Sequence, residues 1–455
     1  MKKTTRQIDM LNGPLAGKML LFALPLAATG ILQQLFNAAD IAVVGQFVGS
    51  DAMAAVGANT SVLSLFLNLF IGISLGANVV IATFTGQKNR DGITKAVHTA
   101  ILIALFGGCA LTIIGEILTC PILSLMGVPS EVMDMAVLYL RTYLLGMPVI
   151  LLYNFESAIF RSQGDTRTPL ICLIISGIIN VGLNLLFVVV LHRSVDGVAL
   201  ATVLSNLISA FLLFIVLLRT DMPVRISISK LRIDKQILIR ILKIGVPAGV
   251  QSMVFSLSNV VAQSAINSLG ASVMAASTAA FNIEILTFYV ITAFSQGCTT
   301  FIGQNYGAGK IQRCRRIFGI GLTESMILTA VMMAVILLFP AQLLSIFNSD
   351  SEILEYGAIR LWFIMAFYPF NTWNETVSGT MRGYGRSLVP ALMALICICG
   401  TRIIWILGVF PHVRTFVNLM TAYPISWIVN SVALFIAYVI FMCYLKKKEI
   451  TSSAG

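Results

Sequence analysis

The sequence contains two copies of one pattern, and matched residues are separated by a constant number of positions, as Pro148 is from Pro369. This duplication restricts the fold more than any other feature. Across the best matched stretch the two copies align without a gap. Further upstream, Pro25 and Asn37 match Pro247 and Asn259 at an offset that is longer by one, so one residue was gained or lost between the copies. A chain built this way is expected to fold into two similar halves. The best matched stretch pairs Pro148, Ser157, Arg161, Gly164 and Pro169 with Pro369, Ser378, Arg382, Gly385 and Pro390.

The composition excludes a water-soluble globule. Of the 455 residues, 58% are hydrophobic and only 11% are charged, whereas soluble domains carry about 25% charged residues. The net charge of +11 does not indicate nucleic-acid binding, because the basic residues fall between apolar runs and not in one patch. We therefore expect a membrane protein, in contact with lipid and without a nucleic-acid partner.

Twelve apolar stretches are long enough to cross a bilayer, which takes about 20 residues each. They predict an all-α polytopic membrane protein with two lobes of six transmembrane helices. Because each lobe has an even number of spans, the lobes are expected to be related by a pseudo-twofold axis along the membrane normal, an arrangement typical of transporters. The predicted spans are 19–46, 53–84, 96–125, 134–160, 168–191, 197–218, 241–268, 275–304, 316–346, 357–381, 388–410 and 416–445.

Lys and Arg residues gather on one side of these spans. Most of the 30 basic residues fall there, and this side is expected to face the cytoplasm. It includes both chain ends and the segment between the lobes, which we expect to be a solvated hinge that touches anionic lipid. The predicted divisions are an N-terminal lobe at 1–218, a basic cytoplasmic linker at 219–240, a C-terminal lobe at 241–445 and a cytoplasmic tail at 446–455.

Four motifs give the chain a family resemblance. They read LPLAATGILQQLFNAADIAVVGQF at 24–47, FRSQGDTRTP at 160–169, IINVGLN at 178–184 and MRGYGRSLVP at 381–390. In their order, spacing and duplication they resemble the multidrug and toxic compound extrusion (MATE) transporters over nearly the whole chain. The resemblance implies two six-helix lobes with alternating access. It also implies export of bulky, often cationic and amphipathic compounds, driven by the inward flow of protons or sodium.

Asp40 is the leading candidate for coupling, because it lies well inside the first apolar segment and far from basic residues in sequence. An ionised carboxylate within a span costs about 2.5–3.5 kcal/mol, so it must face a cavity, be paired or be protonated. In the family, the aspartate at this motif position is linked to the proton or cation. The alternative is a carboxylate at the outer water interface.

Three further polar residues are candidates for the same site. Asn180 and Asn184 lie four residues apart and share one helix face. The family pattern commonly has Asn and then Asp here, so this chain lacks a second acidic group. Thr202 matches another polar position of the family. Amide and hydroxyl oxygens can ligate sodium or hydrogen-bond a carboxyl, and ordinary interhelical polar packing is the alternative for all three.

A substrate cavity is expected beside Asp40, with an apolar wall that suits amphipathic ligands. Acidic residues in the C-terminal half are candidates for contact with a drug or ion, with structural pairing to polar neighbours as the alternative; the same two readings apply to Glu156. A second cation site is doubtful there, because Phe255 and Asn371 stand where some family members have acidic residues. The candidate cavity residues are Gln33, Gln34, Phe36, Asn37, Asn154, Glu284 and Glu375.

These features predict a multi-pass exporter of the bacterial inner membrane that works by proton antiport. Sodium coupling stays open, and a flippase for lipid-linked oligosaccharides or polysaccharide precursors is the alternative within the superfamily. An enzyme is not expected, because the sequence has no nucleophile–base pair, metal-ligand spacing or phosphate-binding motif. We expect a monomer with amphipathic small molecules as substrates, no cofactor and no metal site.

Overall fold

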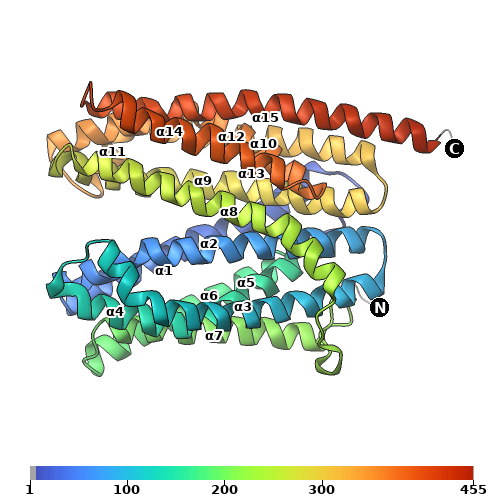
Figure 1. Cartoon of the computed structure of the whole chain (residues 1–455), viewed down its shortest axis with the longest axis horizontal. Helices are drawn as coiled ribbons and strands as arrows, with labels where there is room; N and C mark the ends of the chain where they lie inside the picture. The colour runs from blue at the N-terminus through green and yellow to red at the C-terminus, as the bar shows by residue number, and fades with distance from the viewer. Residues whose placement is uncertain (1–6, 454–455) are drawn as a thin grey trace. The chain divides into compact units, whose positions relative to one another are not determined.

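The computed structural model describes residues 7–453, and this part of the chain is helical without a β-strand (Figure 1). The predicted all-α membrane fold is confirmed. The first copy of the repeat contributes α1 (Ala16–Phe47), α2 (Ser50–Gly86), α3 (Arg90–Leu125), α4 (Ser130–Leu145), α5 (Met147–Ser162), α6 (Arg167–Leu185) with the π-helical η1 (Leu186–Val190), and α7 (Val195–Arg219).

The second copy follows a short 3-10 turn, η2 (Ile228–Lys230). One of its spans is assembled from short α-helical and π-helical pieces that follow one another without a loop. The elements are α8 (Lys235–Asn267), α9 (Ala271–Gly307), α10 (Ile311–Leu338), α11 (Pro340–Ser345), α12 (Ser351–Gly383), α13 (Leu388–Met393), η3 (Ala394–Gly400), α14 (Thr401–Ile404), η4 (Trp405–Val409) and α15 (Phe416–Ser453).

The repeat is visible in the positions at which helices begin. Five helices of the first copy have a counterpart that begins at the offset separating Pro148 from Pro369. The copies differ in where their helices are broken. In the first copy the chain breaks at Gly146 and bends by 49° between α4 and α5, whereas in the second copy α12 continues through Pro369. The matched pairs are α2 and α9, α3 and α10, α4 and α12, α6 and α13, and α7 and α15.

Within residues 7–453, ten helices are long and apolar enough to cross a membrane, or eleven if the bent pair of α4 and α5 is one span. Twelve spans were predicted, and the difference lies in α12. This helix covers the tenth predicted span with 33 residues, but it is more polar than the others because it carries several charged groups. Its charged residues are Glu352, Glu355, Arg360, Glu375 and Arg382.

By their internal contacts the residues form two compact units. Unit 1 contains the described residues up to Gly13 together with Leu24–Gly249 and Gly303–Gly309. Unit 2 contains Pro14–Ala23, Val250–Ile302 and the residues from Lys310 onward. Each unit therefore includes a short segment from the other half of the sequence: Pro14–Ala23 belongs to unit 2 and Gly303–Gly309 to unit 1. The predicted division into two sequential lobes does not describe these segments. The basic residues at 1–6 and the last two residues of the predicted tail lie outside the described part.

The predicted linker at 219–240 packs against unit 1 and is not a fully solvated hinge. Val224 and Ile226 are buried in the core of that unit, since an apolar side chain gains free energy by leaving water. His98 of α3 is itself buried and holds the linker. Its Nε2 lies 3.0 Å from the backbone nitrogen of Ser227, which donates to it.

Candidate functional site

The Asp40 site is built where α1 packs against α6. The ring of Phe36, one turn before Asp40, lies over Gly177 so closely that a Cβ atom at Gly177 would meet it at 1.8 Å. An alanine at this point of α6 would be accommodated only if the ring of Phe36 moved. Phe36 stands on the same stretch of α1 as the predicted cavity residues, and this contact fixes how α1 presents Asp40 to α6.

Asp40 is buried and receives hydrogen bonds from two helices. Asn184 Nδ2 on α6 donates to Asp40 Oδ1 at 2.5 Å, and Thr202 Oγ1 on α7 lies 2.9 Å from Asp40 Oδ2. Asn184 Nδ2 also lies 3.3 Å from Asn180 Oδ1, and Asn180 Nδ2 lies 3.5 Å from Thr202 Oγ1. The structure thus brings together all four residues named from the sequence as coupling candidates.

The hydroxyl of Thr202 can serve both protonation states of Asp40. It has one hydrogen and two nearby acceptors, Asp40 Oδ2 at 2.9 Å and the backbone oxygen of Val198 at 3.0 Å. With Asp40 ionised, the hydroxyl donates to the carboxylate. With Asp40 protonated, the acid proton can be donated to Thr202 Oγ1 while the hydroxyl donates to Val198, because a hydroxyl oxygen both donates and accepts. The site can gain or lose a proton without losing its contacts.

The end of α6 is irregular beside this cluster. Two residues after Asn184 the helix changes from α to the π-helical η1, Leu186–Val190. Such π-helical segments are uncommon and recur at functional sites. The irregularity begins within two turns of both Asn184 and Asn180.

The predicted cavity residues of α1 differ in exposure. Gln33 and Asn37 are exposed, whereas Gln34 and Phe36 are half-buried. Asn154 on α5 is half-buried, and its amide donates to the backbone oxygen of Ile150 at 2.8 Å in its own helix. The assignment of these residues to a substrate cavity stays a prediction.

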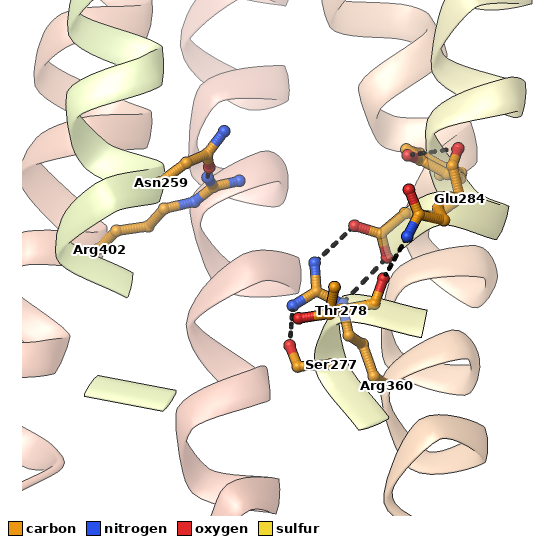
Figure 2. Close-up of polar contacts among 8 residues, drawn as sticks. Asn259, Ser277, Thr278, Glu284, Arg360 and Arg402 are labelled. Carbon is orange, nitrogen blue, oxygen red and sulfur yellow. Dashed lines mark hydrogen bonds and ion pairs between the residues drawn. The ribbon is translucent and has the colours of Figure 1, made fainter. Parts of the chain in front are cut away.

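Glu284 of α9 forms a buried ion pair with Arg360 of α12 (Figure 2). Arg360 Nη2 lies 2.6 Å from Glu284 Oε1, and Arg360 Nε lies 3.2 Å from Oε2. Arg360 Nη1 also donates to Ser277 Oγ at 2.5 Å. Both carboxylate oxygens are thus engaged, which favours the structural alternative over an open carboxylate that would attract a cationic drug. The sequence did not identify Arg360 as the partner.

The other two acidic candidates, Glu375 and Glu156, lack the two-contact ion pair that Glu284 forms. Glu375 is half-buried and lies 3.4 Å from Arg382 Nη2, seven residues further along α12. Glu156 on α5 is completely buried, and both of its carboxylate oxygens lack a hydrogen-bond partner within residues 7–453. An ionised carboxylate that is buried without a partner is costly, so Glu156 differs from the paired Glu284.

A second buried cation, Arg402 on α14, was not among the candidate residues named from the sequence. It is the largest side chain that the described residues bury almost completely, with 1% exposed. Its Nη1 donates to Asn259 Oδ1 at 3.1 Å (Figure 2), and its Nε donates to Ser426 Oγ at 3.1 Å. The position of an arginine in the middle of the apolar run at 388–410 was the available signal.

The described residues contain no group of three or more His, Cys, Asp and Glu side chains that could hold a metal ion. The oxygen atoms of Asp40 and of the polar side chains around it could still bind a monovalent cation.

Comparison with known families identifies two matched segments. The family model described as MatE matches residues 25–186 and 247–406. These two segments correspond to the two copies of the repeat and include Asp40, Asn180, Asn184 and Arg402.

Curated relatives match along most of the chain. A protein described as a probable multidrug resistance protein, YoeA of Bacillus subtilis (strain 168), is 29% identical over 447 residues, which is 95% of each chain. The probable multidrug resistance protein NorM of Thermotoga maritima is 28% identical over 391 residues, covering 85% of this chain and 84% of that one.

A solved structure supports the fold. It is the outward-facing conformation of a multidrug resistance MATE family transporter of the MOP superfamily. It matches with a TM-score of 0.89 and 22% identity over 98% of this chain and 100% of that chain. The fold predicted from the repeat and the motifs is confirmed.

Proposed function

Because the chain belongs to the MatE family of transporters, which are not enzymes, we propose that it exports amphipathic, often cationic drugs in exchange for protons. The relatives described as probable multidrug resistance proteins support the substrate class. Asp40 is proposed as the proton carrier, with Asn180, Asn184 and Thr202 as its supporting residues.

The observation that carries this proposal is the double role of Thr202 beside Asp40. A proton carrier must be stable in both protonation states, since it holds the proton in one part of the cycle and lacks it in another. The distances of 2.9 Å and 3.0 Å from Thr202 Oγ1 to its two acceptors meet that requirement. Protonation removes the cost of a buried charge, and drug binding that favours the ionised form expels the proton by linkage.

Sodium is the second candidate for the coupling ion, and one observation favours it. Asn184 Oδ1 is buried without a hydrogen-bond partner in the described part of the chain. An amide oxygen next to a carboxylate is a suitable ligand for a hard cation. The residue types at the site fit either coupling ion, and the transport experiment below distinguishes protons from sodium.

The same proposal includes the topology and the location. We place the chain in a bacterial inner membrane with both ends and the basic linker on the cytoplasmic side, by the distribution of Lys and Arg. The two units would then alternate between inward and outward access as a monomer.

Transport by purified protein in liposomes tests the proposal. Efflux of a cationic dye would be followed with a pH gradient alone, with a sodium gradient alone and with neither. We expect the pH gradient to drive dye movement and the sodium gradient to have little effect. The variant Asp40→Asn should lose this response, and Asp51→Asn, which changes an exposed carboxylate, should keep it. Sodium-driven movement would select the second candidate, and movement under neither gradient would reject antiport.

A further inference from the structure

A cavity of about 670 Å³ lies in unit 1, where the linker passes the ends of two helices. Its volume falls in the range of about 300–1,000 Å³ that is usual for ligand pockets. Arg90 and Thr94 at the start of α3 line it, as does Leu218 at the end of α7, and the other lining residues belong to the linker. The docked linker thus encloses space for a ligand away from the Asp40 site.

The cavity carries an excess of positive charge. Three basic side chains line it, and Asp221 is the acid among the lining residues. Within residues 7–453, none of the three basic side chains has an ion pair with an acid. Their charge is therefore available to an anion that enters the cavity. The three basic residues are Arg90, Arg225 and Lys230.

Arg225 is held in place by one edge of its guanidinium. Its Nε donates to the backbone oxygen of Leu218, in the last turn of α7, at 3.1 Å. The backbone beside it is held too, because the nitrogen of Ile226 donates to the oxygen of Leu217 at 3.0 Å. Nη1 and Nη2 of Arg225 make no hydrogen bond within residues 7–453. Guanidinium nitrogens match the oxygens of a phosphate in pairs, so the fold positions this donor group before an anion binds.

Two hydroxyl groups add a further donor to the same cavity. Ser227 Oγ and Ser229 Oγ lie 3.1 Å apart, so one hydroxyl donates to the other. A hydroxyl has a single hydrogen, and the pair therefore keeps one hydrogen for another acceptor. The backbone nitrogen of Ser227 is fixed by its hydrogen bond to His98, at 3.0 Å. A phosphate oxygen is a suitable acceptor for the remaining hydrogen.

The position of the cavity favours a lipid over a soluble anion. Both α3 and α7 are long and apolar enough to cross a membrane. The start of α3 and the end of α7 therefore lie near a membrane surface, at the level of the lipid head groups. Ile228 lines the same cavity and is 66% exposed. An exposed isoleucine beside basic and hydroxyl side chains suits the boundary between head groups and acyl chains.

We propose that this cavity binds the phosphate of an anionic phospholipid, whose glycerol backbone lies against Ile228. The phosphate oxygens accept from Arg225 and from the remaining serine hydrogen, and Arg90 and Lys230 supply further positive charge. A zwitterionic lipid carries its own cation, which the excess positive charge of the cavity repels. The bound lipid holds the linker against α3 and α7. This site depends neither on the exported compound nor on the coupling ion.

Native mass spectrometry of the purified full-length protein counts bound lipids and tests this site. Dioleoyl-phosphatidylglycerol, which is anionic, would be compared with dioleoyl-phosphatidylcholine, which has the same acyl chains and no net charge. We expect one phosphatidylglycerol to bind about ten-fold or more tightly than phosphatidylcholine, because each basic residue near an anionic lipid contributes about a factor of five. Arg225→Gln should weaken phosphatidylglycerol about ten-fold, as loss of a hydrogen bond to a charged group predicts, and leave phosphatidylcholine unchanged.

Two matched variants separate the cavity from the general charge of the linker. Arg232→Gln removes the same charge from an exposed residue of the linker that does not line the cavity. It should weaken phosphatidylglycerol by less than about three-fold, since exposed charges contribute little. Arg90→Gln changes a lining residue that lies on α3 and outside the linker. It should weaken phosphatidylglycerol about five-fold, and it decides the matter if Arg225→Gln does not fold.

The assignment is overturned by equal affinity for the two lipids. It is also overturned by equal losses for Arg225→Gln and Arg232→Gln, which would indicate only a diffuse attraction to the linker. Glycerol phosphate has the phosphate without the acyl chains and separates a lipid from a soluble anion. At a concentration equal to that of phosphatidylglycerol it should not displace the lipid, and displacement would assign the cavity to a soluble phosphate compound instead.

Discussion

The buried ion pair between Glu284 and Arg360 gives the sharpest stability prediction. Arg360 is 4% exposed and Glu284 is 5% exposed, and two nitrogen–oxygen contacts at 2.6 Å and 3.2 Å join them. In Glu284→Gln the guanidinium stays buried but loses its counter-charge. Breaking a buried pair on one side costs about 3–5 kcal/mol, because the remaining charge is uncompensated. We expect a loss in this range for the free energy of unfolding.

The same reasoning predicts that a second change restores part of the stability. Replacing both residues, as in Glu284→Gln with Arg360→Met, removes the isolated charge. The double variant should therefore be destabilised by less than the sum of the two single variants, with a coupling free energy of about 2–3 kcal/mol. Glu375→Gln is the matched control in the same unit. Its pair with Arg382 has one contact at 3.4 Å and is partly exposed, so a loss of about 1 kcal/mol or less is expected.

Titration of the purified protein in mild detergent with a denaturing detergent would measure these differences by tryptophan fluorescence. The four tryptophans are Trp362, Trp373, Trp405 and Trp427, all in unit 2, so the signal reports the unit that contains the pair. Equal stability losses for Glu284→Gln and Glu375→Gln would refute the reasoning. So would strict additivity in the double variant.

Three further predictions follow from local geometry. Gly177→Ala should reduce transport strongly, because the new Cβ would meet the ring of Phe36 at 1.8 Å. Gly182→Ala on the same helix is the control, because a Cβ there has open space, and this variant should transport normally. Thr202→Val should lower the rate of pH-driven dye efflux about ten-fold, which liposome assays can measure, since its hydroxyl contact to the carboxyl is lost; an unchanged rate would remove Thr202 from the coupling site. His98→Ala should free the backbone of Ser227 and speed cleavage of the linker by trypsin, whereas an unchanged cleavage rate would contradict the observed docking.

Much of the fold could be predicted from the sequence, because long apolar runs and the duplication are properties of the chain itself. Helices that begin at the offset of the repeat confirm that it describes structure and not composition alone. The count of twelve spans depends on α12, which was predicted as the span 357–381 but is less apolar than the ten helices that qualify as spans by length and composition. The charged residues of α12 are accommodated by ion pairs inside unit 2, since Arg360 pairs with Glu284 and Glu375 pairs with Arg382.

Contacts between distant segments were the part that the sequence could not provide. Asp40, Asn180, Asn184 and Thr202 were named together because motif positions grouped them, and the structure brings them within hydrogen-bond distance. Glu284 was different, because its partner is 76 residues away and no local pattern points to it.

Arg402 shows a second limit of sequence reasoning. Charge counting treats an arginine inside an apolar run as an exception, although the cost of burying it predicts a built environment. The linker shows a third limit, since Val224 and Ile226 are buried although the basic residue Arg225 stands between them in the sequence. Only the fold shows that a core lies within their reach.

The number of protons released when a cationic drug binds to the purified protein tests the central claim most directly. Calorimetry in buffers of different ionisation enthalpy measures it. If the drug favours the ionised form of Asp40, linkage requires that binding release a proton and that affinity rise with pH. The account predicts release of about one proton per drug from wild-type protein and about none from Asp40→Asn, whose affinity should not depend on pH. Equal proton release from both proteins would contradict the account.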